Sequence, residues 1–440
     1  MLFPYQEDGA EFLSDRRAAM IADPPGLGKT AQAITGVDKV DAKRVLVICP
    51  ASLKTNWSRE FAKFSTGWST HIVANGKYRL PDMSVGKHVV IVNYDILFAP
   101  AIFMQMTFVE QDWDVMIVDE AHYLKTRGTR RTNAVYGEAC DRERSVAARA
   151  NRIWLLTGTP TPNGDPSEIW THLRATGYTD LGFHKFMFRY GVYAQTKYGH
   201  RFIKTQNVDE LKASLANFML RRKKEDVLKD MPPIVLADLV VEAEHAKDLR
   251  DLESHPEIEM LRAMTGGDVP DAVLAEASQK ELATLRRYAG ILKVRPVANV
   301  VKDELRNGDG KIVLFAWHKE VLALLRAELA EFNPVSITGE TPSTKRQDAV
   351  DTFQGDTNCR VFLGQITAAG TGITLTAASR MIIVEPSFVP ADNEQASLRI
   401  HRIGQRDGCL VQFAALADSV DEVVTEVLRR KTQALIDIYE

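Results

Sequence analysis

The chain has 440 residues, enough for two or three domains of about 100–200 residues each. Hydrophobic residues make up 45% of it and charged residues 26%, a composition that excludes fibrous and disordered proteins. Its apolar runs are shorter than the roughly 20 residues of a membrane helix, and its first residues lack the basic start and apolar centre of a signal peptide. We therefore expect a cytoplasmic protein with no membrane partner.

The net charge of −3 neither favours nor excludes a nucleic-acid partner, so local clusters matter more. Basic residues gather in "KTRGTRR" at 125–131 and "RRKK" at 221–224. Such runs are usually solvated faces unless a site lies beside them. The four cysteines are scattered without a C-x-x-C pair, which indicates reduced thiols rather than a zinc site or a disulfide framework.

In chain order, residues 18–160 alternate short β-branched runs with helical stretches, which predicts a parallel sheet flanked by helices. A helix is expected at 28–40, and the expected strands are 18–23, 44–50, 88–94, 114–120 and 152–158. Each strand ends in polar or small residues, at the edge where open α/β sheets bind ligands. The first α/β lobe is therefore expected at 1–230, with a helical protrusion at about 163–225.

The alternation resumes after a helix-rich stretch, which predicts a second parallel sheet. Its expected strands are 311–317, 334–339, 360–365, 379–386 and 410–417, and apolar residues at helical spacing predict a last helix over 419–440. The second lobe is expected at 231–440, with a helical insertion at about 243–306.

A phosphate-binding loop is indicated by "ADPPGLGKT" at 22–30, between a strand and a helix. In this role Lys29 neutralises the β/γ oxygens and the Thr30 hydroxyl ligates Mg²⁺. The residues expected to hold the nucleotide here are Asp23, Gly26, Leu27, Gly28, Lys29 and Thr30. Asp23 stands where Gly is usual, and Pro24 and Pro25 each remove a backbone N–H donor. The alternative is a Gly-rich turn that happens to precede a lysine.

An acidic pair, Asp119 and Glu120, ends the strand of "VMIVDEAH" about ninety residues further on. Asp119 is the candidate Mg²⁺ ligand, and Glu120 is the candidate group that polarises the attacking water. The alternative is an exposed acidic strand end, which the loop upstream makes much weaker. Together the two motifs indicate an ATPase that uses ATP and Mg²⁺.

These motifs and several others resemble the Swi/Snf-type branch of the superfamily 2 helicases. In that branch the phosphate-binding loop has the pattern D-E-x-G-L-G-K-T. Asp23 matches this pattern, whereas the two prolines depart from it. The further similar segments are "LFPYQEDGAEFL", "VLVICPASLKTNWSREFAKF", "VIVNYDIL", "LLTGTPTPN", "LRRKKEDVLKDMPP", "KIVLFAWHKEVL", "ITGETPSTKRQDAVDTFQ", "GQITAAGTGITLTAASRMIIVEP" and "QASLRIHRIGQ". The resemblance covers nearly the whole chain and implies two RecA-like lobes, with ATP and DNA bound in and across the interlobe cleft.

By matching positions, the resemblance implies that Gln6 recognises adenine and that Gly372 and Gln395 also contact the nucleotide. Arg399 and Arg402 match arginine fingers, which can accelerate phosphoryl transfer by about 10³–10⁵-fold, roughly 4–7 kcal/mol. We expect the two arginines one helical turn apart, so that both face one cleft. Without the resemblance they would be ordinary surface arginines of a helix.

The resemblance also implies translocation on double-stranded DNA through sequence-independent, salt-sensitive phosphate contacts. The expected DNA-contacting residues are Lys54, Asn93, Tyr94, Lys125, Arg127, Arg130, Arg131, Thr157, Gly158, Thr159, Thr338, Gly370 and Thr371. The segment 183–211 mixes aromatic and basic residues, which suits either base stacking or an aromatic core under a loop. It is more similar to the annealing helicases, which act on forks and branched DNA, than to nucleosome remodellers.

The leading hypothesis is an ATP-dependent translocase that moves branch points, reverses forks or anneals strands, as a monomer on DNA and with replication or recombination proteins as possible partners. A second is the motor subunit of a restriction, defence or other DNA-remodelling complex. A third is an ATP-gated DNA clamp that does not travel, and an RNA helicase is weaker still. The span from the adenine motif to the last helix predicts a minimal motor, of the kind that suits a bacterium or a bacterial virus.

Overall fold

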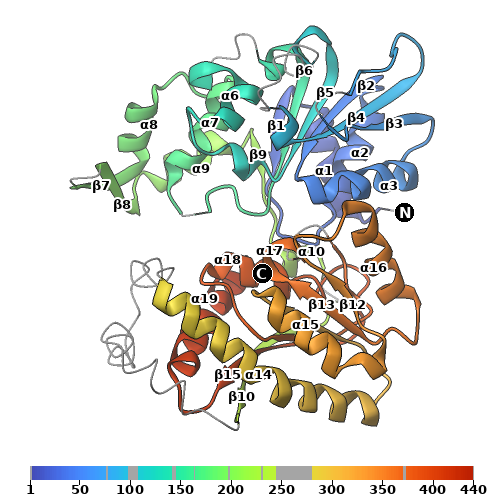
Figure 1. The fold of residues 1–440 in the computed structure, drawn as a ribbon. Helices are drawn as coiled ribbons and strands as arrows, with labels where there is room; N and C mark the ends of the chain where they lie inside the picture. Colours follow the sequence, from blue (N-terminus) through green and yellow to red (C-terminus); the bar gives the residue numbers. More distant parts are fainter. Residues whose placement is uncertain are drawn as a thin grey trace. The chain divides into compact units, whose positions relative to one another are not determined.

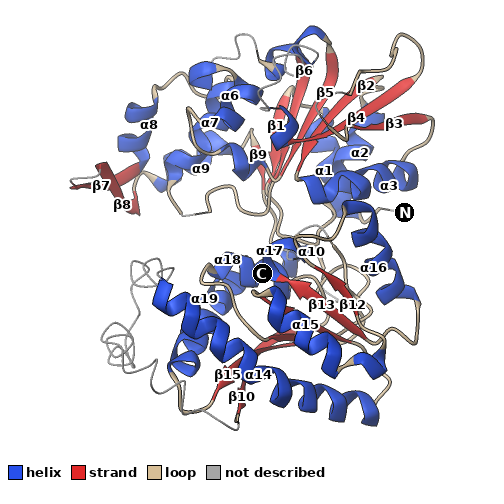
Figure 2. Ribbon diagram, in the orientation of Figure 1, coloured by secondary structure: helices blue, strands red, loops and turns tan. Residues whose placement is uncertain are grey.

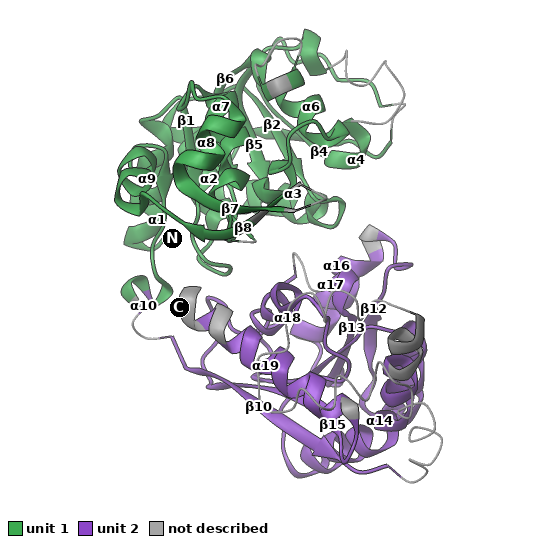
Figure 3. Ribbon diagram, turned by 90° about the vertical axis from the view of Figure 1, so that its left-hand side faces the viewer, with its two compact units in different colours: residues 1–227 green, residues 228–440 purple. Residues whose placement is uncertain are grey.

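The computed structural model describes residues 2–439 except 76–77, 98–107, 141–144, 163, 197–198, 229–230, 244–279 and 370–372. The chain folds into two compact units, Met1–Val227 and Leu228–Glu440 (Figure 3). Each unit has its own parallel sheet (Figure 1). Each also has its own apolar core.

In the described part of unit 1, seven strands pair in parallel in the order β3-β4-β2-β5-β6-β1-β9. The strands are β1 (Ala18–Ile21), β2 (Arg44–Cys49), β3 (Trp68–Ile72), β4 (Lys87–Asn93), β5 (Trp113–Asp119), β6 (Ala150–Leu156) and β9 (Met219–Leu220). The five strands expected from sequence before residue 160 are confirmed as β1, β2, β4, β5 and β6, whereas β3 and β9 were not predicted.

Helices cover both faces of this sheet (Figure 2), and its strands β1, β2, β4, β5 and β6 are accordingly buried and mainly apolar. On one face lie α1 (Pro4–Ser14), α2 (Lys29–Lys39) and α3 (Lys54–Phe64), with Leu13, Ile34 and Trp57 in the core that they share. The opposite core contains residues of α6 (Arg130–Tyr136), α7 (Trp170–Thr176) and α8 (Phe183–Tyr190). Because the side chains of a strand alternate, β1 sends Ala18 and Met20 to one core and Ala19 and Ile21 to the other.

The region expected to be a helical protrusion also contains an antiparallel pair of strands. Here β7 (Gly191–Thr196) pairs with β8 (Gly199–Thr205), between α8 and α9 (Val208–Leu215), at the side of unit 1 (Figure 1). In the segment 183–211, Phe186 and Tyr190 are buried in the core, as the aromatic-core alternative expects. Phe188 is 47% exposed, and base stacking by this segment stays a prediction.

In the described part of unit 2, six strands pair in parallel in the order β10-β15-β14-β11-β13-β12. They are β10 (Ile234–Val241), β11 (Ile312–Ala316), β12 (Val335–Ile337), β13 (Val361–Gln365), β14 (Arg380–Ile383) and β15 (Cys409–Leu416). The helices are α14 (Lys280–Asn307), α15 (Lys319–Glu328), α16 (Ser343–Gly355), α17 (Ile366–Ala369), α18 (Pro390–Ser397) and α19 (Val420–Tyr439). Of the insertion expected at 243–306, residues 244–279 lie outside the described residues, and α14 forms the rest.

The expected fold class, α/β with two parallel-sheet lobes, is therefore confirmed. All four cysteines lie in described residues, and each is a buried thiol outside any disulfide. In the described part of the chain, every helix is too short or too polar to cross a membrane.

Candidate nucleotide site and nucleic-acid contacts

The loop between β1 and α2 has the turns that a phosphate-binding loop needs. Gly26 and Gly28 have φ angles of 93° and 71°, which side chains of L-residues disfavour. A Cβ on Gly28 would lie 2.4 Å from Nε2 of Gln6, so any side chain there would displace the end of Gln6. Lys29 then begins α2, and Thr30 lies in its first turn. The loop thus leaves a helix N-terminus at the carboxyl end of β1, and helix N-termini bind phosphates in other proteins.

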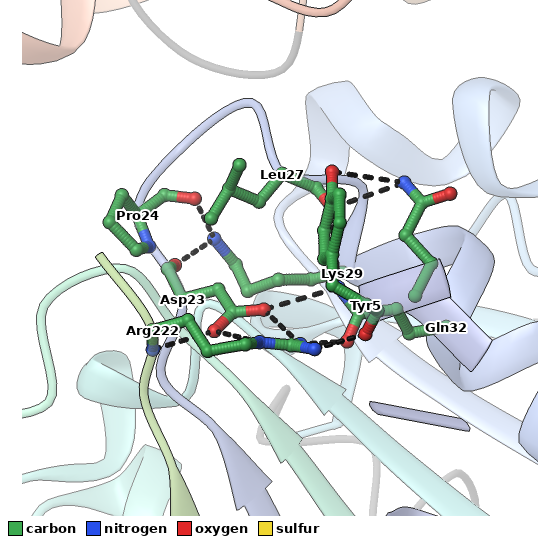
Figure 4. Close-up of polar contacts among 8 residues, drawn as sticks. Tyr5, Asp23, Pro24, Leu27, Lys29, Gln32 and Arg222 are labelled. Carbon is green, nitrogen blue, oxygen red and sulfur yellow. Dashed lines mark hydrogen bonds and ion pairs between the residues drawn. The ribbon is translucent and has the colours of Figure 1, made fainter. Parts of the chain in front are cut away.

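Lys29 is held by carbonyl groups of its own loop (Figure 4). Its Nζ donates to the carbonyl of Asp23 at 2.7 Å and to that of Pro24 at 3.3 Å. The two prolines at the loop entrance lack N–H groups, but the first of them still supplies an acceptor. A bound triphosphate would therefore compete with these carbonyls for the ammonium group.

The helix α1 places Gln6 directly against the loop. Nε2 of Gln6 donates to the carbonyl of Leu27 at 3.2 Å, and the Tyr5 hydroxyl donates to the same carbonyl at 3.3 Å (Figure 4). Oε1 of Gln6 accepts from the N–H of Phe3 at 3.0 Å. Burial, and then the negative charge of Asp23, raise the pKa of Tyr5 to about 12, so its hydroxyl stays a donor at neutral pH. The residue expected to recognise adenine and the loop therefore form one rigid unit.

Asp23 contacts protein groups through its fully buried carboxylate. Oδ1 accepts from the backbone N–H and from Nε of Arg222, at 3.1 and 3.2 Å. Oδ2 accepts from Nη2 of Arg222 at 2.5 Å and from Nε2 of Gln32 at 3.2 Å. Direct nucleotide contact by the Asp23 side chain stays a prediction. Sequence reasoning missed Arg222 and Gln32, because "RRKK" gave only a charge signal and Gln32 gave none.

Asp119 ends β5, and both of its carboxylate oxygens have protein donors. Nε1 of Trp57 donates to Oδ2 at 2.8 Å, and the N–H of Glu120 donates to Oδ1 at 3.0 Å. Burial, and then the charge of Glu120, raise the pKa of Asp119 to about 7. A cation would offset both effects, and carboxylate and hydroxyl oxygens, such as those of Asp119 and Thr30, are ligands that Mg²⁺ takes. The donor set therefore fits the expected metal.

Glu120 adopts a left-handed backbone conformation, with φ 51° and ψ 52°, that few residues other than glycine accept. The Tyr94 hydroxyl donates to the carbonyl of Asp119 at 2.6 Å and lies 3.4 Å from that of Glu120. On the other side, Nδ1 of His122 lies 3.2 Å from Oε2 of Glu120 and 3.1 Å from the Thr157 hydroxyl. These contacts hold the acidic pair in one arrangement.

The loop of Thr157, Gly158 and Thr159 packs on the phosphate-binding loop. A Cβ on Gly158 would lie 3.0 Å from Cδ of Pro25, and the Thr159 N–H donates to the Thr157 hydroxyl at 3.1 Å. The prolines therefore have a structural consequence, since Pro25 is the surface against which Gly158 rests.

Some of the residues expected to contact DNA are engaged inside unit 1. Asn93 and Tyr94 are 6% and 3% exposed. Nζ of Lys54 donates to Oδ1 of Asn93 at 3.1 Å and to the carbonyl of Val73 at 2.8 Å. Asn93 and Tyr94 are therefore buried, and Lys54 is hydrogen-bonded within unit 1. Contact of these three side chains with DNA stays a prediction.

The basic run 125–131 is partly neutralised by neighbours. Lys125 pairs with Glu168 at 2.6 Å, and Arg131 pairs with Asp95 at 3.3 Å. The guanidinium of Arg131 also lies 5.4 Å from the ring of Tyr94 and 5.0 Å from that of Tyr123. Arg127 lies 4.4 Å from the ring of Phe183. Arg127 and Arg130 are exposed and so are the members of the run best placed to contact a phosphate.

In unit 2, Thr338 follows β12, and its N–H donates to the Thr341 hydroxyl at 2.9 Å. Gln395 lies in α18 and is half-buried. The expected contacts at Gly370, Thr371 and Gly372 lie outside the described residues.

The expectation that Arg399 and Arg402 share a helix is wrong, because α18 ends at Ser397. The carbonyl of Arg399 accepts from the N–H of Leu375 at 3.0 Å, which draws the chain out of the helix. Arg399 is 4% exposed, whereas Arg402 is half-buried and donates to the Thr374 hydroxyl at 3.1 Å.

Two family models match the chain: "SNF2-related domain" over residues 5–248 and "Helicase conserved C-terminal domain" over 294–404. A Caenorhabditis elegans protein, "SWI/SNF-related matrix-associated actin-dependent regulator of chromatin subfamily A-like protein 1 homolog", is 31% identical over 99% of this chain and 61% of its own length. The Homo sapiens protein "DNA annealing helicase and endonuclease ZRANB3" is 29% identical over 98% of this chain and 40% of its own length. The chain therefore spans about half the length of such relatives.

Among solved structures, the Sulfolobus solfataricus SWI2/SNF2 ATPase core in complex with dsDNA is similar over 100% of this chain and 95% of that chain. The sequence identity is 22% and the TM-score is 0.45, a likeness too low to support an argument.

Proposed function

Since the chain belongs to the SNF2-related family, we propose that it is a DNA-dependent ATPase that translocates on double-stranded DNA and remodels branched or forked DNA. The observation that carries this proposal is the pairing of two motifs at one sheet edge. The Lys29 loop follows β1 and the Asp119–Glu120 pair ends β5, and both strands neighbour β6. Because all three strands are parallel, both motifs lie at their carboxyl ends.

In this proposal Lys29 neutralises the triphosphate, Gln6 binds adenine, and Glu120 orients the attacking water. Asp119 and Thr30 would hold Mg²⁺, which neutralises charge on the phosphates when bound. Arg399 and Arg402 supply positive charge to the transition state from unit 2. Hydrolysis then depends on closure of the two lobes, and this dependence converts an ATPase into a motor.

The proposed substrate is a fork or a junction, and the proposed outcomes are branch migration, fork reversal or strand annealing. The human relative has "DNA annealing helicase" in its name, which supports this choice over nucleosome remodelling. The exposed residues of the basic run 125–131 would contact the phosphates. Action as a monomer on DNA, beside replication or recombination proteins in the cytoplasm, belongs to the same proposal.

The test is the steady-state ATPase rate with blunt duplex, single strand, fork and four-way junction. We expect strong stimulation by DNA, with the fork or the junction most effective. Lys29→Ala and Glu120→Gln should both abolish turnover, whereas Lys39→Ala, at the exposed end of the same helix, should leave it intact. A basal rate indifferent to every DNA would contradict the proposal.

A further inference from the structure

Arg222 is the contact that ties the phosphate-binding loop to the end of unit 1. It lies between β9 and α10 (Lys224–Val227), and unit 2 begins directly after α10, at Leu228. Its partner Asp23 is 199 residues earlier in the chain, at the loop entrance. Figure 4 shows the guanidinium lying along the Asp23 carboxylate, below the loop.

The geometry of this pair is specific to arginine. Nε donates to one carboxylate oxygen of Asp23 and Nη2 donates to the other, which is the two-pronged arrangement of an arginine and a carboxylate. The remaining nitrogen, Nη1, donates to the carbonyl of Tyr5, and Nη2 also donates to Oε1 of Gln32 at 2.7 Å. A lysine keeps the charge but cannot form the fork.

The helix α1 also packs closely on the network around Arg222. A Cβ on Gly9 would lie 1.9 Å from Oε1 of Gln32 and 2.9 Å from Nη2 of Arg222. The helix α1 therefore rests its backbone on the same cluster. One set of contacts thus joins α1, the loop, α2 and the chain that leads into unit 2.

Asp23 connects this network to the phosphate-binding loop through its backbone carbonyl and its carboxylate. Its carbonyl accepts from Nζ of Lys29, and its carboxylate holds Arg222. A triphosphate that draws the Lys29 ammonium away from this carbonyl changes the contacts of the residue that anchors Arg222. The helix α10 begins two residues after Arg222.

We propose that Arg222 is a positioning residue that transmits occupancy of the phosphate-binding loop, through Asp23, to the segment that joins the two units. The proposal rests on the proposed function, because it concerns how ATP is coupled to DNA. It assigns Arg222 a role in DNA-stimulated turnover rather than in ATP binding.

The first experiment compares Arg222→Lys with wild-type protein by measuring the KM for ATP and the kcat with and without a fork. We expect the KM for ATP to change less than about threefold and the ratio of DNA-stimulated to basal kcat to fall by about 10- to 100-fold, the scale of a small misplacement. Arg16→Lys is the matched control, because Arg16 donates to the carbonyls of Asn217 and Phe12. It should keep the wild-type ratio.

A purely structural role for Arg222 predicts another pattern, in which the melting temperature falls while the stimulation ratio stays near the wild-type value. That result overturns the proposal. Asp23→Asn removes the charge from the other side, and the double variant with Arg222→Lys should stimulate no worse than the poorer single variant, because both break one contact. Additive losses overturn the proposal too.

The second experiment uses wild-type protein only, so a variant that fails to fold cannot affect its result. Amide hydrogen exchange is measured on wild-type protein with and without a non-hydrolysable ATP analogue. We expect altered exchange in residues 221–228 as well as in the loop 22–30. Protection of the loop alone overturns the proposal. If DNA does not raise the kcat of wild-type protein in the first experiment, that result contradicts the proposed function itself.

Discussion

Replacing Gly28 with alanine should lower the free energy of unfolding by an amount that the structure sets. The left-handed backbone at φ 71° costs a residue with a Cβ about 1–2 kcal/mol. The new Cβ would also lie 2.4 Å from Nε2 of Gln6, and moving that side chain breaks its hydrogen bond to the carbonyl of Leu27, worth about 1 kcal/mol. The sum is a destabilisation of about 2–3 kcal/mol.

The assay is urea titration of wild-type protein and of each variant, with the free energy of unfolding as the readout. Gly67→Ala is the matched control, because Gly67 has a φ of 79° and a Cβ there would meet nothing within 4 Å. It should lose only the backbone contribution of about 1–2 kcal/mol. The reasoning is refuted if Gly28→Ala unfolds like wild-type protein, or if Gly67→Ala is destabilised as much as Gly28→Ala.

Three further predictions test the surroundings of the site. Tyr94→Phe removes the hydroxyl that donates to the buried carbonyl of Asp119 at 2.6 Å. In urea titrations the free energy of unfolding of unit 1 should fall by about 1–3 kcal/mol. The kcat should fall as well, because Tyr94 no longer holds the backbone of Glu120 in place. Burial lowers the pKa of His172 from 6.5 to about 3, so the unfolded chain binds a proton that the folded chain does not. The free energy of unfolding should fall by about 1.4 kcal/mol per unit as pH drops from 6.5 towards 3, and His172→Asn should remove that slope in urea titrations at several pH values. Arg130→Ala should weaken DNA binding alike for all sequences and reduce the salt slope of log Kd by about 1 in binding titrations.

The sequence predicts those features that depend on local pattern. Five strands of unit 1 follow from apolar runs, and the loop of Lys29 follows from glycine spacing. By contrast, β9 is only two residues long and β3 is largely polar, so neither has the run that signals a strand.

The features that sequence reasoning missed depend on contacts between distant residues. Arg222 reaches Asp23 only because β9 pairs with β1. The end of α18 before Arg399 depends on the N–H of Leu375, which lies on another segment. The spacing of residues along the sequence predicts neither contact. It does not predict the packing of Pro25 on Gly158 either.

The most direct test of the central claim is displacement of a third DNA strand from a triplex by wild-type protein with ATP. A motor that travels along the duplex removes the third strand, and Glu120→Gln does not. Rapid hydrolysis of ATP with the third strand still in place would contradict translocation and leave a DNA clamp as the better account.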